Sequence, residues 1–82
     1  MSERNKISEV IDAYATVMRK HRLRMSISQE ELAHRAGLSL SFVSLLETGK
    51  RQPTISTISV LCKALDVSMV EFIGELEVRL SS

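Results

Sequence analysis

Apolar residues recur at helical spacing along almost the whole chain, which predicts an all-α fold. Between residues 7 and 24 an apolar residue appears every three or four positions, so this segment is expected to form a helix with one face toward a core. The residues assigned to that face are Ile7, Val10, Ile11, Tyr14, Val17 and Met18. The same spacing predicts four further helices, near residues 28–36, 40–48, 54–66 and 68–80.

Polar residues and glycines at the boundaries of these segments support the same division. A hydroxyl residue followed three positions later by glutamate forms a capping box, in which each side chain satisfies a free backbone amide at the start of a helix. Such pairs are Ser28 with Glu31 and Ser68 with Glu71, and Ser39 is placed to cap the helix between them. Gly37 and Gly49 are expected to end the second and third helices, because glycine adopts the left-handed conformation past a helix end at little cost.

The organisation predicted for residues 1–82 is a single domain. The chain contains no internal repeat, low-complexity tract or linker. Within it, two short helices joined by a tight glycine-containing turn at 28–48 form a helix-turn-helix unit. A chain of this length buries only about 60% of its unfolded surface, so a partner subunit would stabilise it.

Composition excludes several classes of protein. Hydrophobic residues make up 44% of the chain, which favours a packed globule, and no apolar run reaches the roughly 18 residues of a membrane span. The polar start at residues 1–6 lacks the apolar core of a signal peptide, so we expect a cytoplasmic protein with no membrane association. A single cysteine and two distant histidines predict neither a disulfide nor a metal site, and no cofactor is expected.

The distribution of charge changes the picture more than the net charge of +1. Residues 1–51 carry nine Lys or Arg against six Asp or Glu, a balance of +3, whereas residues 52–82 carry two against four, a balance of −2. This asymmetry would direct one end of the molecule toward a phosphate backbone and leave the other for protein contacts.

The segment from Ser28 to Pro53, SQEELAHRAGLSLSFVSLLETGKRQP, resembles the phage-repressor and Cro-like helix-turn-helix family, often called the XRE family. The resemblance covers roughly residues 18–72, with many positions in register. It implies a compact five-helix lambda-repressor-like fold and a sequence-specific transcriptional regulator that binds double-stranded DNA, not an enzyme.

The resemblance also implies roles for individual residues. The helix over 40–48 would lie in the major groove, with the helix over 28–36 crossing the backbone above it. Gln29 would contact a phosphate and buttress the reading helix, Lys50 and Arg51 would hold the next phosphates, and Phe42 would lie near the backbone. The full set of expected DNA-binding residues is Gln29, Ser39, Leu40, Ser41, Phe42, Ser44, Leu45, Lys50 and Arg51.

Leu40 and Leu45 depart from the family pattern, which often has Gln, Arg or Lys at these base-reading positions. Leucine cannot donate a hydrogen bond, but it can pack against the C5-methyl group of thymine. We therefore expect readout of thymine-containing steps, with Ser41 or Ser44 adding hydrogen bonds and DNA shape supplying the remainder. The alternative is that one or both leucines belong to the core or to a subunit interface.

Arginines near the end of the first helix have two interpretations. Arg22 and Glu47 match a family pair, which implies a partly buried ion pair that fixes the angle between helices, in preference to a DNA contact by Arg22. Arg19, Lys20 and Arg24 either contact phosphates or only offset the negative end of the helix dipole.

Residues that suggest an enzyme or a metal site have simpler explanations. Cys62 is expected to be a buried, inert thiol, and His21 a half-buried packing residue in preference to a pH sensor. His34 is expected on an exposed face, and no third group completes a catalytic set. The acidic residues of the last helix, which are expected on a solvated face that repels DNA, are Glu71, Glu75 and Glu77.

The last helix, from about residue 68, is the expected site of dimerisation, because its apolar residues exceed what a small core requires. The interface residues predicted there are Phe72, Ile73, Leu76 and Leu80. The first turns of the first helix are a second candidate part of this interface, and capping of the monomer core is the alternative. A homodimer on a palindromic operator follows, acting as a repressor or by contact with polymerase. An antitoxin with a toxin partner and a helical protein-binding adaptor are the other functions considered.

Overall fold

The computed structural model describes residues 6–81, and this part of the chain forms five helices and no strands. The helices are α1 (Lys6–Arg24), α2 (Gln29–Ala36), α3 (Leu40–Glu47), α4 (Ile55–Ala64) and α5 (Met69–Ser81). The predicted all-α fold is confirmed, and each helix lies within a few residues of its predicted place. None of the helices described here is long and apolar enough to cross a membrane.

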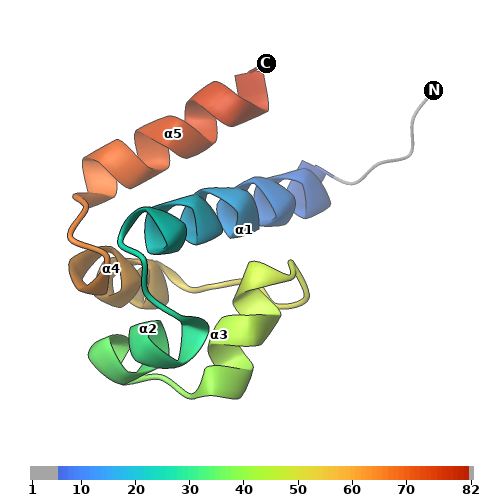
Figure 1. The fold of residues 1–82 in the computed structure, drawn as a ribbon. Coiled ribbons are helices and arrows are strands. Elements are labelled where there is room, and N and C mark those ends of the chain that lie inside the picture. The colour runs from blue at the N-terminus through green and yellow to red at the C-terminus, as the bar shows by residue number, and fades with distance from the viewer. Residues whose placement is uncertain (1–5, 82) are drawn as a thin grey trace.

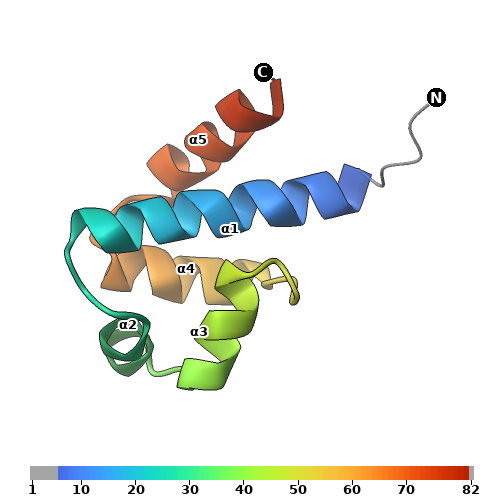
Figure 2. The same cartoon turned by 45° about the vertical axis from the view of Figure 1, so that its right-hand side comes forward.

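The helices are arranged so that α3 and α5 lie on opposite sides of α1. The long α1 crosses the middle of the molecule, α2, α3 and α4 lie on one side of it, and α5 packs on the other (Figures 1 and 2). Contacts between α1 and α5, α1 and α3, α2 and α3, α2 and α4, and α4 and α5 connect these layers. A surface on α3 and a surface on α5 can therefore serve different partners.

Hydroxyl side chains begin four of the helices. The Oγ atoms of Ser28 and Ser39 accept hydrogen bonds from the backbone amides three residues ahead at 3.0 and 3.1 Å, and Thr54 and Ser68 do the same for α4 and α5. Each bond satisfies an amide that the helix itself leaves free. In a full capping box, the Glu31 carboxylate would accept a hydrogen bond from the backbone amide of Ser28. In the described part of the chain, this carboxylate accepts from Arg35 Nε at 2.8 Å and forms an ion pair with it.

Gly37 ends α2, as predicted, and Gly49 follows the Thr48 cap at the end of α3. Gly37 has a φ of +70° and donates its amide to carbonyls of the last turn of α2. Gly49 has a φ of +73°, and a Cβ there would lie 3.1 Å from the carboxylate of Asp12 on α1. At Gly49 both the backbone conformation and the close approach of α1 disfavour a larger residue.

All five helices contribute to one hydrophobic core. Its buried residues are Ala13, Tyr14, Val17, Met18, Leu32, Ala33, Val43, Leu46, Ile58, Leu61, Cys62, Leu65, Phe72 and Leu76. The prediction that Ile7 and Val10 also face the core is wrong, since they are 58% and 43% exposed. The first turns of α1 extend beyond the helices that cover its centre, so the apolar stripe continues into solvent (Figure 2).

The structure also corrects the predicted interface on α5. Phe72 and Leu76 are 0% and 7% exposed, because they form the side of α5 that packs on the core. They are therefore unavailable to a second subunit, and they cover the core of the monomer, which was the alternative to a dimer interface. Ile73 and Leu80 are covered less completely, at 38% and 42% exposed.

A polar cluster joins α1 to α5. His21, expected to be half-buried, is fully buried, stacks near the ring of Phe72, and its Nε2 lies 3.0 Å from a carboxylate oxygen of Glu75. Lys20 donates to the same oxygen at 3.1 Å. Burial opposes ionisation of Glu75, but these two hydrogen bonds outweigh it and hold the pKa of the carboxyl below its usual value. Glu75 is thus partly buried and links α5 to α1, contrary to the expected solvated position. Glu71 and Glu77 are exposed, as expected.

Cys62 is 2% exposed in the core, as expected for an inert thiol. Burial raises its pKa to about 11, so the reactive thiolate is scarce at neutral pH.

The hydroxyl of Tyr14 is the one buried side-chain polar atom of residues 6–81 without a hydrogen-bond partner. An unpaired buried hydroxyl costs about 1–3 kcal/mol, so Tyr14→Phe should increase the free energy of unfolding by about 1 kcal/mol. Thermal melts would detect this as a rise in Tm of about 4–8 °C. A clear loss of stability would show instead that the hydroxyl is satisfied, for example by a bound water.

Candidate nucleic-acid interface

Helix α3 has one buried side and one outer side. Val43, Leu46 and Glu47 are buried against the rest of the molecule. At about 100° per residue, the remaining polar and leucine positions fall within an arc of about 140° on the opposite side. We call these residues the outer face of α3, and they are Leu40, Ser41, Ser44, Leu45 and Thr48.

Exposure varies along the outer face. Leu40 is 48% exposed, Ser41 and Thr48 are exposed, and Ser44 and Leu45 are partly buried. Ser41 is therefore accessible to a partner, and Ser44 is accessible in part. Sequence reasoning missed Thr48, which follows the last turn of α3 and donates its hydroxyl to the carbonyl of Ser44 at 2.9 Å.

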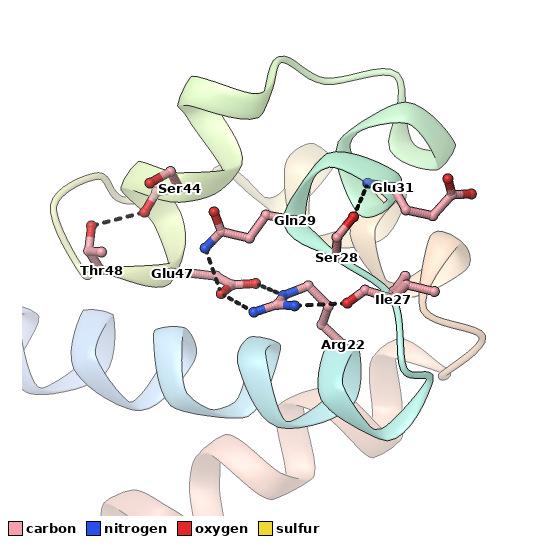
Figure 3. A network of polar contacts seen from close by, with 8 residues as sticks. All are labelled: Arg22, Ile27, Ser28, Gln29, Glu31, Ser44, Glu47 and Thr48. Atoms are coloured by element: carbon pink, nitrogen blue, oxygen red, sulfur yellow. Dashed lines mark hydrogen bonds and ion pairs between the residues drawn. The ribbon is translucent and has the colours of Figure 1, made fainter.

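A network of polar contacts fixes α3 against α1 and α2 (Figure 3). Arg22 on α1 binds Glu47 through Nε at 2.5 Å and through a second guanidinium nitrogen at 3.0 Å, and its remaining nitrogen donates to the carbonyl of Ile27 at 2.8 Å. Glu47 is 4% exposed and the Arg22 side chain 11%, so this is a buried ion pair. All three guanidinium nitrogens are engaged within the protein, which favours the structural interpretation of Arg22 over a DNA contact.

Gln29 completes this network from the start of α2. Its Nε2 donates to Glu47 Oε1 at 3.0 Å, so the side chain lies between α2 and the end of α3 (Figure 3). This contact supplies the buttress that the family resemblance implies. The same amide group has a second hydrogen that this contact does not use.

The loop after α3 carries two exposed cations, Lys50 and Arg51. The guanidinium carbon of Arg51 lies 5.8 Å from the centre of the Phe42 ring, within the range of a cation–π contact. Phe42 is itself partly buried against the core, so it connects this loop to the first half of α3. The family resemblance implies that Arg51 and Phe42 lie near the DNA backbone, but nothing in the sequence indicated that the two side chains contact each other.

Two other residues singled out in the sequence are also exposed. Ser39 is exposed, and its Oγ serves as the cap of α3, with the hydroxyl hydrogen left to donate. His34 is exposed on α2, as expected. Within residues 6–81, no group of three or more His, Cys, Asp or Glu side chains is arranged to hold a metal ion.

Comparison with known proteins identifies relatives of this chain. A model of the helix-turn-helix family matches residues 18–72. An uncharacterized HTH-type transcriptional regulator, y4dJ of Sinorhizobium fredii, is 42% identical over 52 residues, which cover 63% of this chain and 68% of the relative. The control protein C.SmaI of Serratia marcescens is 33% identical over 61 residues, 74% of this chain and 73% of that protein.

Solved structures agree with the sequence relatives. A single-residue mutant of the restriction-modification controller protein C.Esp1396I superimposes with a TM-score of 0.84 at 30% identity, covering 89% of this chain and 92% of that one. The C.Esp1396I tetramer in complex with its natural 35 base-pair operator gives a TM-score of 0.83 at 29% identity, covering 89% and 96%. The helices, the fixed orientation of α3 and these similarities together show that the chain belongs to the XRE-type helix-turn-helix family of transcriptional regulators.

Proposed function

We propose that the protein is a controller-type transcriptional regulator that binds a palindromic operator as a homodimer, with α3 of each subunit in the major groove. The observation that carries this proposal is the accessible outer face of α3, held by the network of Arg22, Glu47 and Gln29. A rigid, protruding helix is what the geometry of groove reading requires. C.Esp1396I, a protein of similar fold, binds its operator as a tetramer.

Phosphate contacts would come from residues that flank α3. Gln29 lies at the N-terminus of α2, where free backbone amides and the helix dipole favour an anion, and its amide has a hydrogen to spare. Lys50 and Arg51 are exposed in the loop that follows α3. These groups fix the position of α3 on the duplex without reading its sequence.

Dimerisation is needed because one α3 reads few base pairs, whereas two subunits on a palindrome read twice as many. The exposed apolar residues of α5 include Val70, Ile73, Val78 and Leu80, which are 85%, 38%, 69% and 42% exposed. Pairing through α5 leaves both α3 helices free, because α5 lies on the other side of α1 (Figure 1). The two reading helices would then be spaced about 34 Å apart, one turn of DNA.

The controller function is preferred to the antitoxin and adaptor alternatives. The control protein C.SmaI is similar to this chain in sequence, and the controller protein C.Esp1396I is similar to it in fold. An adaptor would also have no use for exposed cations and an anion-favouring helix end beside α3. A dimer bound across a promoter would block polymerase, and one bound beside it would be placed to contact polymerase.

Binding should depend steeply on salt, and Lys50→Ala should reduce the slope of log K against log salt by about one unit without changing the preferred site. The reason is that Lys50 would neutralise one phosphate and read no base. A random DNA library identifies the site, and a salt titration measures the slope. Lys63→Ala, which removes an exposed lysine of α4, is the matched control and should leave the slope unchanged. An unchanged slope for Lys50→Ala would remove Lys50 from the interface.

A further inference from the structure

We infer that α3 selects its operator by the 5-methyl group of thymine, with Leu40 as the principal contact. This inference rests on the proposed function and names the chemical group that its reading helix recognises. It depends on three features of α3, which are the exposure of Leu40, the absence of charge on the outer face and the difference between the two leucines.

Leu40 is the first residue of α3, directly after the Ser39 cap, and 48% of its surface is exposed. The N-terminal residues of a groove-reading helix are those that meet base edges. In the major groove, the apolar group that a base presents at its edge is the C5-methyl of thymine. Contact between that methyl and Leu40 removes apolar surface of both from water.

The outer face provides no charged or amide side chain that could form the stronger purine contacts. The sequence of α3 is LSFVSLLE, so its one charged residue is Glu47, which is buried and paired with Arg22. Bidentate recognition of guanine needs Arg or Lys, and that of adenine needs Asn or Gln. Ser41 and Ser44 offer hydroxyls, which bond to more than one base and discriminate weakly. Methyl contact is therefore the most selective interaction available to α3.

Leu40 and Leu45, which had the same expected role, differ in exposure in the structure. Leu45 is partly buried, whereas Leu40 is 48% exposed and lies at the end of α3 that enters the groove first. Leu40→Ala removes no core residue and places a strong helix former in α3, so the variant is expected to fold. Its effect on DNA can be measured directly.

The test uses the full chain and the operator that it selects from a random library. Thymines are replaced by deoxyuridine at symmetric positions of both half-sites, which removes the methyl and keeps every base-pairing group. At one or two positions per half-site the wild-type protein should bind about fourfold more weakly for each methyl lost, and about 15-fold more weakly when both half-sites are changed. Leu40→Ala should bind the thymine and uracil operators equally. Leu23→Ala, at a leucine of α1 that is 59% exposed, is the matched control and should keep the full difference.

A second arm adds the methyl instead of removing it. At the same position, a cytosine operator should bind weakly, and 5-methylcytosine in its place should recover about fourfold per half-site. Equal wild-type affinity for thymine and uracil at every position would overturn the inference and leave the regulator function intact. An undiminished thymine preference in Leu40→Ala would overturn the role of Leu40. Failure to select any DNA sequence at low salt would instead overturn the proposed function itself.

Discussion

Replacing both Ile73 and Leu80 by glutamate should lower affinity for a two-half-site operator by about 10²–10⁴-fold. These residues are the exposed part of the predicted α5 interface, and four carboxylates would meet in a symmetric dimer. The loss follows because two tethered subunits bind a palindrome far more tightly than one subunit binds half of it. Sedimentation equilibrium would show a monomer, and titration of the operator would measure the lost affinity.

Two controls separate loss of the dimer from loss of the fold or of the DNA surface. Binding to an isolated half-site should change little, because α3 and α5 lie on opposite sides of α1 (Figure 1). Val60→Glu introduces a carboxylate at a valine of α4 that is 41% exposed, and it should leave the dimer intact. A wild-type protein that sediments as a monomer at micromolar concentration would contradict dimerisation through α5.

Arg22→Ala should reduce the free energy of unfolding by about 3–5 kcal/mol. The substitution leaves the 4% exposed carboxylate of Glu47 buried with only Gln29 as a hydrogen-bond donor in the described network, and it frees the carbonyl of Ile27. An unpaired charge in the interior is far more costly than the absence of both partners. Urea unfolding, monitored by circular dichroism, measures the change.

The chain contains its own control for this prediction. Arg35 binds Glu31 at 2.8 Å on the surface of α2, with the two side chains 41% and 44% exposed. Arg35→Ala should therefore cost at most about 0.5 kcal/mol. Combining Arg22→Met with Glu47→Leu removes both buried charges and should recover much of the stability lost in Arg22→Ala. Similar small losses for Arg22→Ala and Arg35→Ala would contradict a structural role for the buried pair.

Much of the fold could be predicted because its signals are local. Helical spacing, hydroxyl caps and glycine stops involve residues within one or two turns of each other, and the structure places Ser39 and Gly37 in the predicted conformations. The pairing of Arg22 with Glu47 joins distant segments and followed only from the family resemblance. The roles assigned to Leu40, Lys50 and Arg51 in binding DNA remain predictions.

Periodicity alone determined which side of each helix is apolar, and the tertiary structure decided how much of that side is covered. The stripe on α1 begins in solvent at Ile7 and ends in the core at Met18, because the neighbouring helices cover only its middle and end. On α5, Phe72 is buried in the core and its neighbour Ile73 is exposed to solvent. Contacts such as Phe42 with Arg51 and His21 with Glu75 likewise depend on how helices cross, which spacing along the sequence does not encode.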